Sequence, residues 1–184
     1  MSLFPHVSTP LLALNPMPFR SGCDVHALFR GTSAGDLMHE DLFTAVYCTD
    51  NVSRVSMQFE IRQPDTTGAL IGCSTLMELN PHAGHVRAGV FVTPDIEGGP
   101  EARHARLLTA NFAFAMWNLR KVYSWQIHGE QPWPNSLAVR EGTLRNFLHD
   151  GLRTLDMDVI ALYRSTWDER GATMVDEISG GTGG

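Results

Sequence analysis

The chain has 184 residues, of which 43% are hydrophobic and 18% are charged, and its formal net charge at pH 7 is -6. A chain of this length can bury one sizeable core but is short for two. The acidic balance argues against a general nucleic-acid or acidic-membrane surface, although a local basic patch remains possible. We therefore expect a single domain over residues 1–178 that binds neither nucleic acid nor membrane.

Two features bear on where the protein resides. No apolar run approaches the roughly 20 residues that a membrane-spanning helix needs, and residues 1–14 lack a basic start followed by a sustained apolar stretch. Cys23, Cys48 and Cys73 are an odd set without close pairing, which favours buried free thiols over a disulfide framework. We therefore expect a cytoplasmic location.

The N-terminal part of the chain shows the weakest patterns. Residues 1–22 are rich in proline and poorly periodic, which predicts an irregular arm with a first strand around residues 11–14. Residues 24–29 and 34–47 look helical, the second with a mixed apolar and polar face. These two helices are the elements that we expect between the arm and the first long strand.

The next part of the chain reads as three strands joined by turns. Residues 53–62 alternate apolar and polar side chains, which is a strong strand signal. The turn at residues 64–68 then leads into a partner strand at residues 69–79. A second turn at residues 80–84 leads into a third strand at residues 85–92.

Residues 88–122 are the most informative stretch, because they read as a strand, a glycine turn, a long helix and a new strand. Gly98 and Gly99 allow a tight turn, and Pro100 suits the first helical position. Free backbone N–H groups in the first turn of such a helix can face an anion. Apolar residues along the predicted helix, residues 100–118, and directly after it recur at steps of three and four and define one buried face: Ala102, Ala105, Leu108, Phe112, Ala115 and Leu119.

After the helix, the pattern predicts later strands at residues 122–128, 143–148 and 157–163. The segment between the first two of these, residues 130–138, contains two prolines, which leave at most a single turn of helix. Residues 179–184 are rich in glycine and predict a flexible tail.

Residues 93–95, 97–102 and 119–122 resemble, in one ungapped register, the central motif of the GCN5-related N-acetyltransferases, or GNAT family. The similarity is greatest to the branch that acetylates ribosomal proteins and amino acids. Residues 70–73 resemble the strand before that motif, and residues 140–151 resemble the terminal hairpin of the branch. The resemblance covers about residues 70–163 and implies an α/β (α+β) fold with a twisted, mostly antiparallel mixed sheet flanked by helices.

The resemblance also implies a chemistry, in which an amine attacks the thioester of acetyl-CoA as co-substrate without a metal. The pantetheine arm would lie beside the splayed strands that match residues 90–92 and 122–128. The diphosphate would meet the loop and the first turn of the helix, where N–H groups and the helix dipole favour negative charge. The cofactor-binding residues that follow from this comparison are Val90, Phe91, Val92, Glu97, Gly98, Gly99, Glu101, Ala102 and Arg103.

Two features of the loop depart from the family pattern. Glu97 stands where the family has Arg or Gln, and Pro100 replaces a glycine and has no N–H to donate. Two unit charges about 4 Å apart interact by roughly 4 kcal/mol at an effective dielectric near 20, so Glu97 weakens diphosphate binding unless it points away. Arg103, His104 or Arg106 can compensate from the first helical turns. Alternatively, the segment is only a favourable helix start.

Two further departures lie outside the loop. The family inserts a helix with an Asn-x-x-Ser pattern after its fifth strand, and residues 130–138 leave no room for it. Trp133 either covers a ligand there or fills the vacated space, and we favour packing. Arg87 replaces an acidic residue that the branch often has on the strand before the loop, and it either faces solvent or contacts a substrate carboxylate.

His128 is the leading candidate for proton transfer. In similar enzymes the end of the fifth strand lies near the acyl group, and imidazole titrates near neutrality. Alternation places His128 on the face of residues 124 and 126, and Glu130 can act beside it. The alternative is a polar strand end bonded to a loop carbonyl. His26, Glu60 and Arg87 are the substrate-binding candidates, from elements that often line the acceptor side.

Three functions remain open. The first is an acyl-CoA-dependent N-acyltransferase that transfers acetyl to an amine of a small molecule or peptide, with a homodimer as one possible assembly. The second is a protein of the same fold that no longer uses coenzyme A and instead binds a ligand or partner, or catalyses another reaction, in the same cleft. The third is a scaffold, which an exposed apolar surface around Trp133 and Trp167 would indicate.

Overall fold

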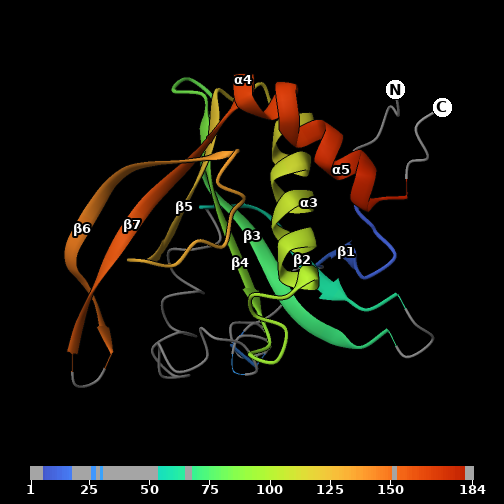
Figure 1. The fold of residues 1–184 in the computed structure, drawn as a ribbon, viewed down its shortest axis with the longest axis horizontal. Coiled ribbons are helices and arrows are strands. Elements are labelled where there is room, and N and C mark those ends of the chain that lie inside the picture. Colours follow the sequence, from blue (N-terminus) through green and yellow to red (C-terminus); the bar gives the residue numbers. More distant parts are fainter. Residues whose placement is uncertain are drawn as a thin grey trace.

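A computed structural model describes residues 6–17, 26–27, 30, 54–64, 68–150 and 153–180. Its sheet has seven strands in the order β1-β2-β3-β4-β5-β7-β6 (Figure 1). Among these strands only β4 and β5 are parallel neighbours. The strands are β1 (Ala13–Pro16), β2 (Val55–Arg62), β3 (Leu70–Asn80), β4 (His85–Val92), β5 (Lys121–Ile127), β6 (Ala138–Asp150) and β7 (Arg153–Tyr163).

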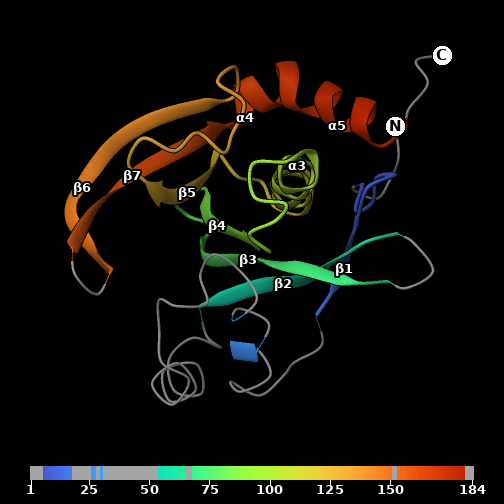
Figure 2. The same cartoon turned by 60° about the horizontal axis from the view of Figure 1, so that its bottom comes forward.

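The long helix α3 (Pro100–Met116) crosses one face of the sheet (Figure 2). Gly99 is its N-cap, and Pro100 occupies the first helical position, where a missing N–H costs nothing. Its apolar side chains pack with inward-facing residues of β1 to β5, among them Phe59, Leu76 and Val86, which are 0% exposed. Burying this face on the sheet is the main stabilising contribution to the helix.

The C-terminal segment adds helices that the sequence analysis does not predict. They are α4 (Arg164–Thr166), the π-helical turn η2 (Trp167–Gly171) and α5 (Ala172–Ile178). Figure 2 shows α5 on the same side of the sheet as α3, and the two helices are in contact. Trp167 stacks on Phe114 of α3, with ring centroids 5.3 Å apart. Because this packing is tertiary, the local sequence carries little sign of it.

Most predicted elements are confirmed, with shifted ends. The strands predicted at residues 143–148 and 157–163 are too short, because β6 and β7 form a long hairpin from Ala138 to Tyr163. Exposed polar residues of the edge strand β6, such as Arg140 and Glu141, break the apolar alternation there. The predicted helix 100–118 ends at Met116, where the N–H of Trp117 bonds to the carbonyl of Ala113.

The described residues include one of the three cysteines. Cys73 is buried and free, as predicted, and burial raises the pKa of its thiol to about 12. Cys23 and Cys48 lie outside the described residues, as do residues 181–184 of the predicted tail. Of the predicted helices at 24–29 and 34–47, the described residues are His26 and Ala27, which are helical.

No helix in the described ranges is long and apolar enough to cross a membrane.

Arg164 ties the C-terminal segment to the end of α3. Its Nη2 donates to the carbonyls of Phe114 and Trp117 at 2.8 and 2.9 Å, and its Nε donates to that of Leu119 at 3.0 Å. These carbonyls belong to the end of α3 and the turn after it, where backbone acceptors lack helical partners. The cation also lies favourably at the negative end of the helix dipole.

Replacing Arg164 by methionine is expected to lower the free energy of unfolding by about 2 kcal/mol, because it keeps the aliphatic stem but removes the charged donors. Urea denaturation measures this change. Arg170→Met is the matched control, since the partner of Arg170 in the structure is the exposed Glu169 beside it. That variant should lose less than about 0.5 kcal/mol. Equal losses in the two variants would contradict the capping role.

Candidate functional site

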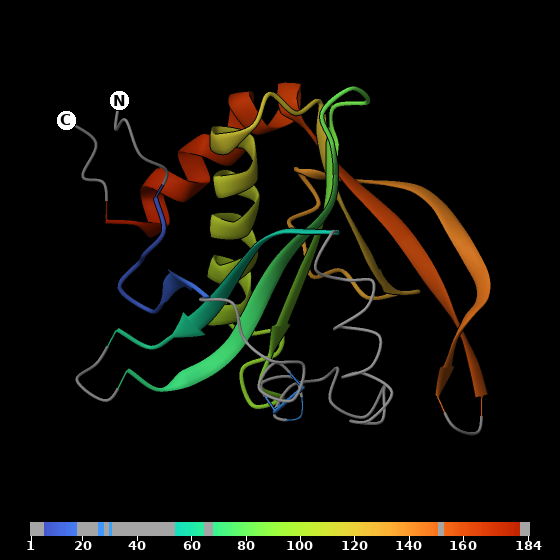
Figure 3. The same cartoon turned by 180° about the vertical axis from the view of Figure 1, so that it is seen from behind.

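The sheet opens between β4 and β5. These strands pair at only three positions, namely His85 with Lys121, Val86 with Val122 and Arg87 with Tyr123. Both strands continue beyond Arg87 and Tyr123, but no ladder joins their described residues there. Figures 1 and 3 show the two strands diverging toward the end of the sheet at which α3 begins. An extended ligand can therefore lie along β4 in the position of a missing strand neighbour.

The loop before α3 forms a tight turn at the open end of this gap. The N–H of Ile96 bonds to the carbonyl of Thr93 at 3.1 Å, and that of Gly99 to the carbonyl of Ile96 at 2.9 Å. Gly98 has φ +82°, in the left-handed region that favours glycine, and a Cβ there would meet open space. The N–H groups of Glu101 and Ala102, in the first helical turn, have no intrahelical partner and suit an anion.

Glu97 is paired with a cation from the helix. Its carboxylate accepts a hydrogen bond from Nη2 of Arg106, whose side chain is 9% exposed. Of the three compensating residues that the sequence suggests, Arg106 therefore takes that role. The paired carboxylate repels an anion much less than a lone one, because the charges nearly cancel at the distance of a bound ligand.

The carboxyl group of Glu130 interacts with the charges of Glu97 and Arg106 at this end of the gap. Burial and then the negative charge of Glu97 raise the pKa of Glu130, and the positive charge of Arg106 partly offsets this rise. The carboxylate of Glu130, which the sequence predicts to act beside His128, is therefore also coupled to the charges of Glu97 and Arg106.

His128 lies just after β5 and contacts a buried carboxylate of β7. Its Nδ1 is 3.0 and 3.1 Å from the two carboxylate oxygens of Asp158, which is 3% exposed. Asp158 also accepts a hydrogen bond from Oγ1 of Thr143 at 2.6 Å. The bonds from Thr143 and His128 lower the pKa of Asp158 from 3.8 to about 2. The side chain of His128 therefore contacts a carboxylate and not the loop carbonyl of the alternative interpretation.

This arrangement gives His128 the geometry of a general base. With Nδ1 held by the carboxylate, Nε2 is the nitrogen that can accept a proton, and the side chain is 51% exposed. A carboxylate on Nδ1 fixes the tautomer and stabilises the imidazolium that forms on proton transfer. Asp158 is not among the predicted site residues, because only the pairing of β5 with β7 places it opposite Gln126.

Two acceptor-side candidates lie on the sheet face opposite α3. Strand register puts Glu60 level with Cys73, and Arg87 level with Met77, on that face. Glu60 is buried and accepts a hydrogen bond from Nε of Arg62 at 2.8 Å. The third candidate, His26, is 6% exposed.

Arg87 is engaged within the protein. Its Nη2 lies 3.0 Å from a carboxylate oxygen of Glu78, and its guanidinium lies 4.3 Å from the ring centroid of Trp125. The phenol of Tyr123 donates to the other oxygen of Glu78 at 3.0 Å. Neither alternative for Arg87, solvent exposure or a substrate carboxylate, describes this pairing. Trp125 is 36% exposed and packs edge-on against Phe147, so this face also carries an accessible aromatic pair.

Two expectations about tryptophans are resolved. Residues 128–137 contain no helix, as the two prolines predict. Trp133 is 5% exposed within this segment and donates a hydrogen bond to Oγ of Ser124, so it packs. Trp167 is 3% exposed. Neither tryptophan therefore contributes the exposed apolar surface that would indicate a scaffold.

No group of three or more His, Cys, Asp or Glu residues within the described ranges could hold a metal ion.

Solved structures similar to this chain share one fold. A chimera of spermidine N-acetyltransferase SpeG from Vibrio cholerae with hSSAT is 19% identical, with TM-score 0.67, over 87% of this chain and 99% of that one. The Vibrio cholerae enzyme in complex with CoA and spermine is 17% identical, with TM-score 0.62, over 85% and 98%. A probable GNAT-family acetyltransferase from Chromobacterium violaceum is 20% identical, with TM-score 0.63, over 88% and 87%. The chain has the GNAT fold.

No family model and no curated protein matches the sequence. The structural similarity confirms the fold that the resemblance implied, with its mixed, mostly antiparallel sheet. The ribosomal-protein branch is not confirmed. The Glu97–Arg106 pair and the irregular segment 128–137 lie at positions where the sequence departs from the family pattern that it resembles.

Proposed function

We propose that the protein is an acyl-CoA-dependent N-acyltransferase that transfers acetyl from acetyl-CoA to an amine of a small molecule. The observation that carries this proposal is the gap between β4 and β5, which opens onto the glycine turn and the N-terminus of α3. Similar structures include spermidine N-acetyltransferases, one of them in complex with CoA and spermine. Those ligands belong to that protein, and they support an amine acceptor here.

The residues at the gap fit a bound coenzyme A. The pantetheine amides pair with the backbone of residues 90–92, which lie beyond the last position at which β4 pairs with β5. The diphosphate lies over residues 97–102, where the open space at Gly98 and the N–H groups of Glu101 and Ala102 receive it. Arg103, which is exposed in the first helical turn, supplies a further positive charge.

His128 then acts as the general base. An aliphatic ammonium must lose a proton before its nitrogen can attack the thioester carbonyl, and Nε2 of His128 takes that proton while Asp158 stabilises the imidazolium. The new C–N bond forms as the C–S bond breaks, and the departing thiolate takes up a proton. Glu130 contributes charge at the loop, and we assign the first proton transfer to His128.

The acceptor approaches from the sheet face opposite α3. Arg87 positions Glu78 and Trp125 there, and the exposed rings of Trp125 and Phe147 offer faces that attract a cationic amine. Glu60 and His26 complete the candidate acceptor side. We assign these residues to substrate binding, and peptide amines remain the second class of acceptor to be tested.

Isothermal titration with acetyl-CoA and with CoA tests the cofactor site. We expect micromolar binding that Gly98→Glu weakens by about tenfold or more, because the variant places a carboxylate at the diphosphate position. Gly180→Glu is the matched control, since Gly180 has φ +79° and equally open space, and lies after α5. Both variants carry the same backbone strain, so only the position of the charge differs.

Release of free thiol from acetyl-CoA in the presence of a panel of amines then tests the transfer. Spermine, a primary alkylamine, an amino acid and a short peptide separate the acceptor classes. No heat and no thermal shift at millimolar CoA would reject the proposal. That result would favour the second reading, in which the fold is kept and the gap serves another ligand, as the irregular segment 128–137 suggests.

A further inference from the structure

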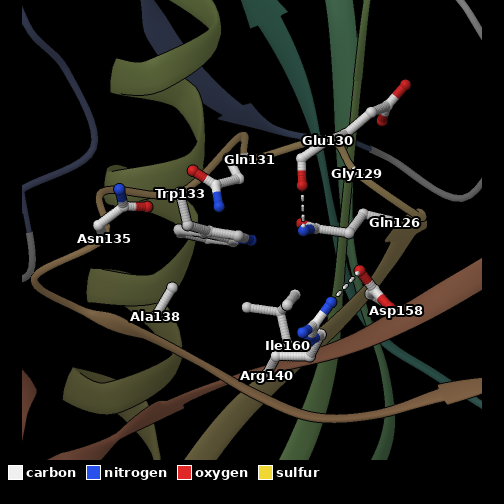
Figure 4. A pocket seen from close by; sticks show the side chains of 10 residues that line it. All are labelled: Gln126, Gly129, Glu130, Gln131, Trp133, Asn135, Ala138, Arg140, Asp158 and Ile160. Carbon is white, nitrogen blue, oxygen red and sulfur yellow. Dashed lines mark hydrogen bonds and ion pairs between the residues drawn. The ribbon is translucent and has the colours of Figure 1, made fainter.

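A cavity of about 290 Å³ lies under the segment that connects β5 to β6. Residues 128–137 close over β5 and β7 on the side of the sheet that carries α3, where no helix is present among them. Figure 4 shows the cavity, which we call the Trp133 cavity. Its walls come from Gln126, Trp133, Ala138, Arg140, Asp158 and Ile160. Because Ala138 and Ile160 belong to β6 and β7, it extends away from the β4–β5 gap.

Side-chain hydrogen bonds hold the roof of this cavity in place. The indole N–H of Trp133 donates to Oγ of Ser124 at 2.9 Å, and Nε2 of Gln126 donates to the carbonyl of Glu130 at 2.7 Å. In Figure 4 the side chain of Glu130 points away from the other lining residues, whereas the amide end of Gln126 points inward toward Trp133. The cavity is therefore pre-formed.

One buried acceptor in the Trp133 cavity has no partner. Gln126 is 8% exposed, and no described residue donates a hydrogen bond to its Oε1. Buried polar atoms are nearly always hydrogen-bonded, because leaving one unmatched is unfavourable. The amide orientation is fixed by the bond from Nε2 to Glu130, so turning the amide over would only exchange one unmatched group for another. Among the described residues this acceptor is unmatched, and a ligand that donates an N–H group would satisfy it.

The walls limit what that donor can be. Asp158 is an ionised carboxylate, and its neighbour Arg140 lies 3.6 Å away and is 58% exposed, so the pair is close to neutral. An anion would meet both the carboxylate and the unmatched Oε1. A hydrocarbon would leave Oε1 unmatched. Trp133, Ala138 and Ile160 supply apolar contact, and the volume equals that of about ten waters, which fits a small molecule.

We propose that the Trp133 cavity binds a small ligand that donates an N–H group to Oε1 of Gln126 and packs a short apolar body against Trp133. A primary ammonium and a carboxamide share this chemistry. The cavity shares Asp158 with the proposed acyl-transfer site, but the contacts to Gln126 and Trp133 lie outside the His128–Asp158 pair and do not require coenzyme A.

Nuclear magnetic resonance of ¹⁵N-labelled protein tests the proposal without coenzyme A. The probes are n-butylammonium, butyramide and butyrate, and the signals are the Trp133 indole N–H and the Gln126 side-chain amide. We expect saturable shifts of both signals with butyramide or n-butylammonium and none with butyrate. Whichever of the two binds more tightly identifies the ligand as neutral or cationic.

Two variants establish the position of the site. Gln126→Leu should weaken binding by about tenfold, the value of one hydrogen bond to a neutral donor. Gln131→Leu, an exposed neighbour that also lines the cavity, should change it less than about twofold. Ala138→Leu reduces the volume without touching Gln126, so it should abolish binding even if Gln126→Leu folds poorly. Thermal denaturation checks that each variant is folded.

Three outcomes would overturn the proposal. Absence of saturable shifts with both N–H probes at millimolar concentration would show that the cavity holds only water. Unchanged binding in Gln126→Leu or Ala138→Leu would place the bound probe elsewhere. Tighter binding of butyrate than of either N–H probe would show that Arg140, rather than Gln126, determines the ligand. None of these results depends on acetyl-CoA binding, so they leave the proposed function to its own test.

Discussion

Replacing Asp158 by asparagine is expected to lower kcat/KM for acetyl transfer by about 10²-fold to 10⁴-fold. The carboxylate holds Nδ1 of His128 at 3.0 and 3.1 Å and is itself held by Thr143. An amide of the same size cannot stabilise the imidazolium and favours the wrong tautomer. Steady-state kinetics at saturating acetyl-CoA measure the loss, and titration with acetyl-CoA should show unchanged cofactor affinity.

His128→Ala and the double variant provide the control for this pair. Groups that act as a unit give losses that do not add, so the double variant should be little worse than His128→Ala alone. Additive losses would mean that Asp158 acts on something other than His128. Losses below about tenfold in both single variants would remove His128 from the mechanism, because positioned acid–base groups usually contribute more.

The low pKa of Asp158 has its own consequence for pH dependence. Its folded pKa of about 2 lies below the ordinary value of 3.8, so the paired carboxylate stabilises the fold above pH 3.8. That stabilisation is lost as the pH falls from 3.8 toward 2. Acid titration of the unfolding transition should therefore show wild type and Asp158→Asn converging over this window. A difference that persists below it would assign the stabilisation to another group.

Local signals in the sequence were enough to predict the centre of the fold. Gly98 and Pro100 constrain the backbone only within a few residues. The turn and the start of α3 could therefore be predicted without knowing the rest of the structure. The alternation in β2 works in the same way. The two prolines of residues 130–138 likewise predict that no full helix follows β5, because proline lacks the backbone N–H that a helix needs.

Features that depend on distant contacts were not predictable. Helix α5 is stabilised against α3 rather than by its own propensity, and β6 is an edge strand whose polar residues are ordered by pairing with β7. The role of Asp158 depends on the register that places it opposite Gln126. A carboxylate in an alternating strand looks like any other exposed polar residue in the sequence. Neither the contact between Asp158 and His128 nor the Trp133 cavity could therefore be inferred.

Removing the guanidinium of Arg106 is expected to weaken acetyl-CoA binding strongly. In Arg106→Met the carboxylate of Glu97 stays on the loop without a partner, 37% exposed, where the diphosphate is proposed to lie. A lone carboxylate a few ångströms from a phosphate opposes binding by up to roughly 4 kcal/mol, and solvent reduces this. We expect the Kd for acetyl-CoA to rise by about 10-fold to 100-fold, as isothermal titration would measure.

Glu97→Gln should act in the opposite direction, because it frees Arg106 to attract the diphosphate, and Glu130→Gln should also tighten binding by removing a neighbouring negative charge. Arg103→Met is the control for simple loss of a positive charge. Arg103 is exposed and its removal uncovers no carboxylate, so it should weaken binding by less than about fivefold.

The double variant Glu97→Gln/Arg106→Met separates charge from structure. If the carboxylate is what opposes the diphosphate in Arg106→Met, removing both groups should restore most of the affinity that the single variant lost. If affinity stays low in the double variant while thermal denaturation shows a folded protein, then Arg106 itself contacts the cofactor. Unchanged affinity in Arg106→Met would mean that the diphosphate does not lie over residues 97–102, and the loop would then serve only to start α3.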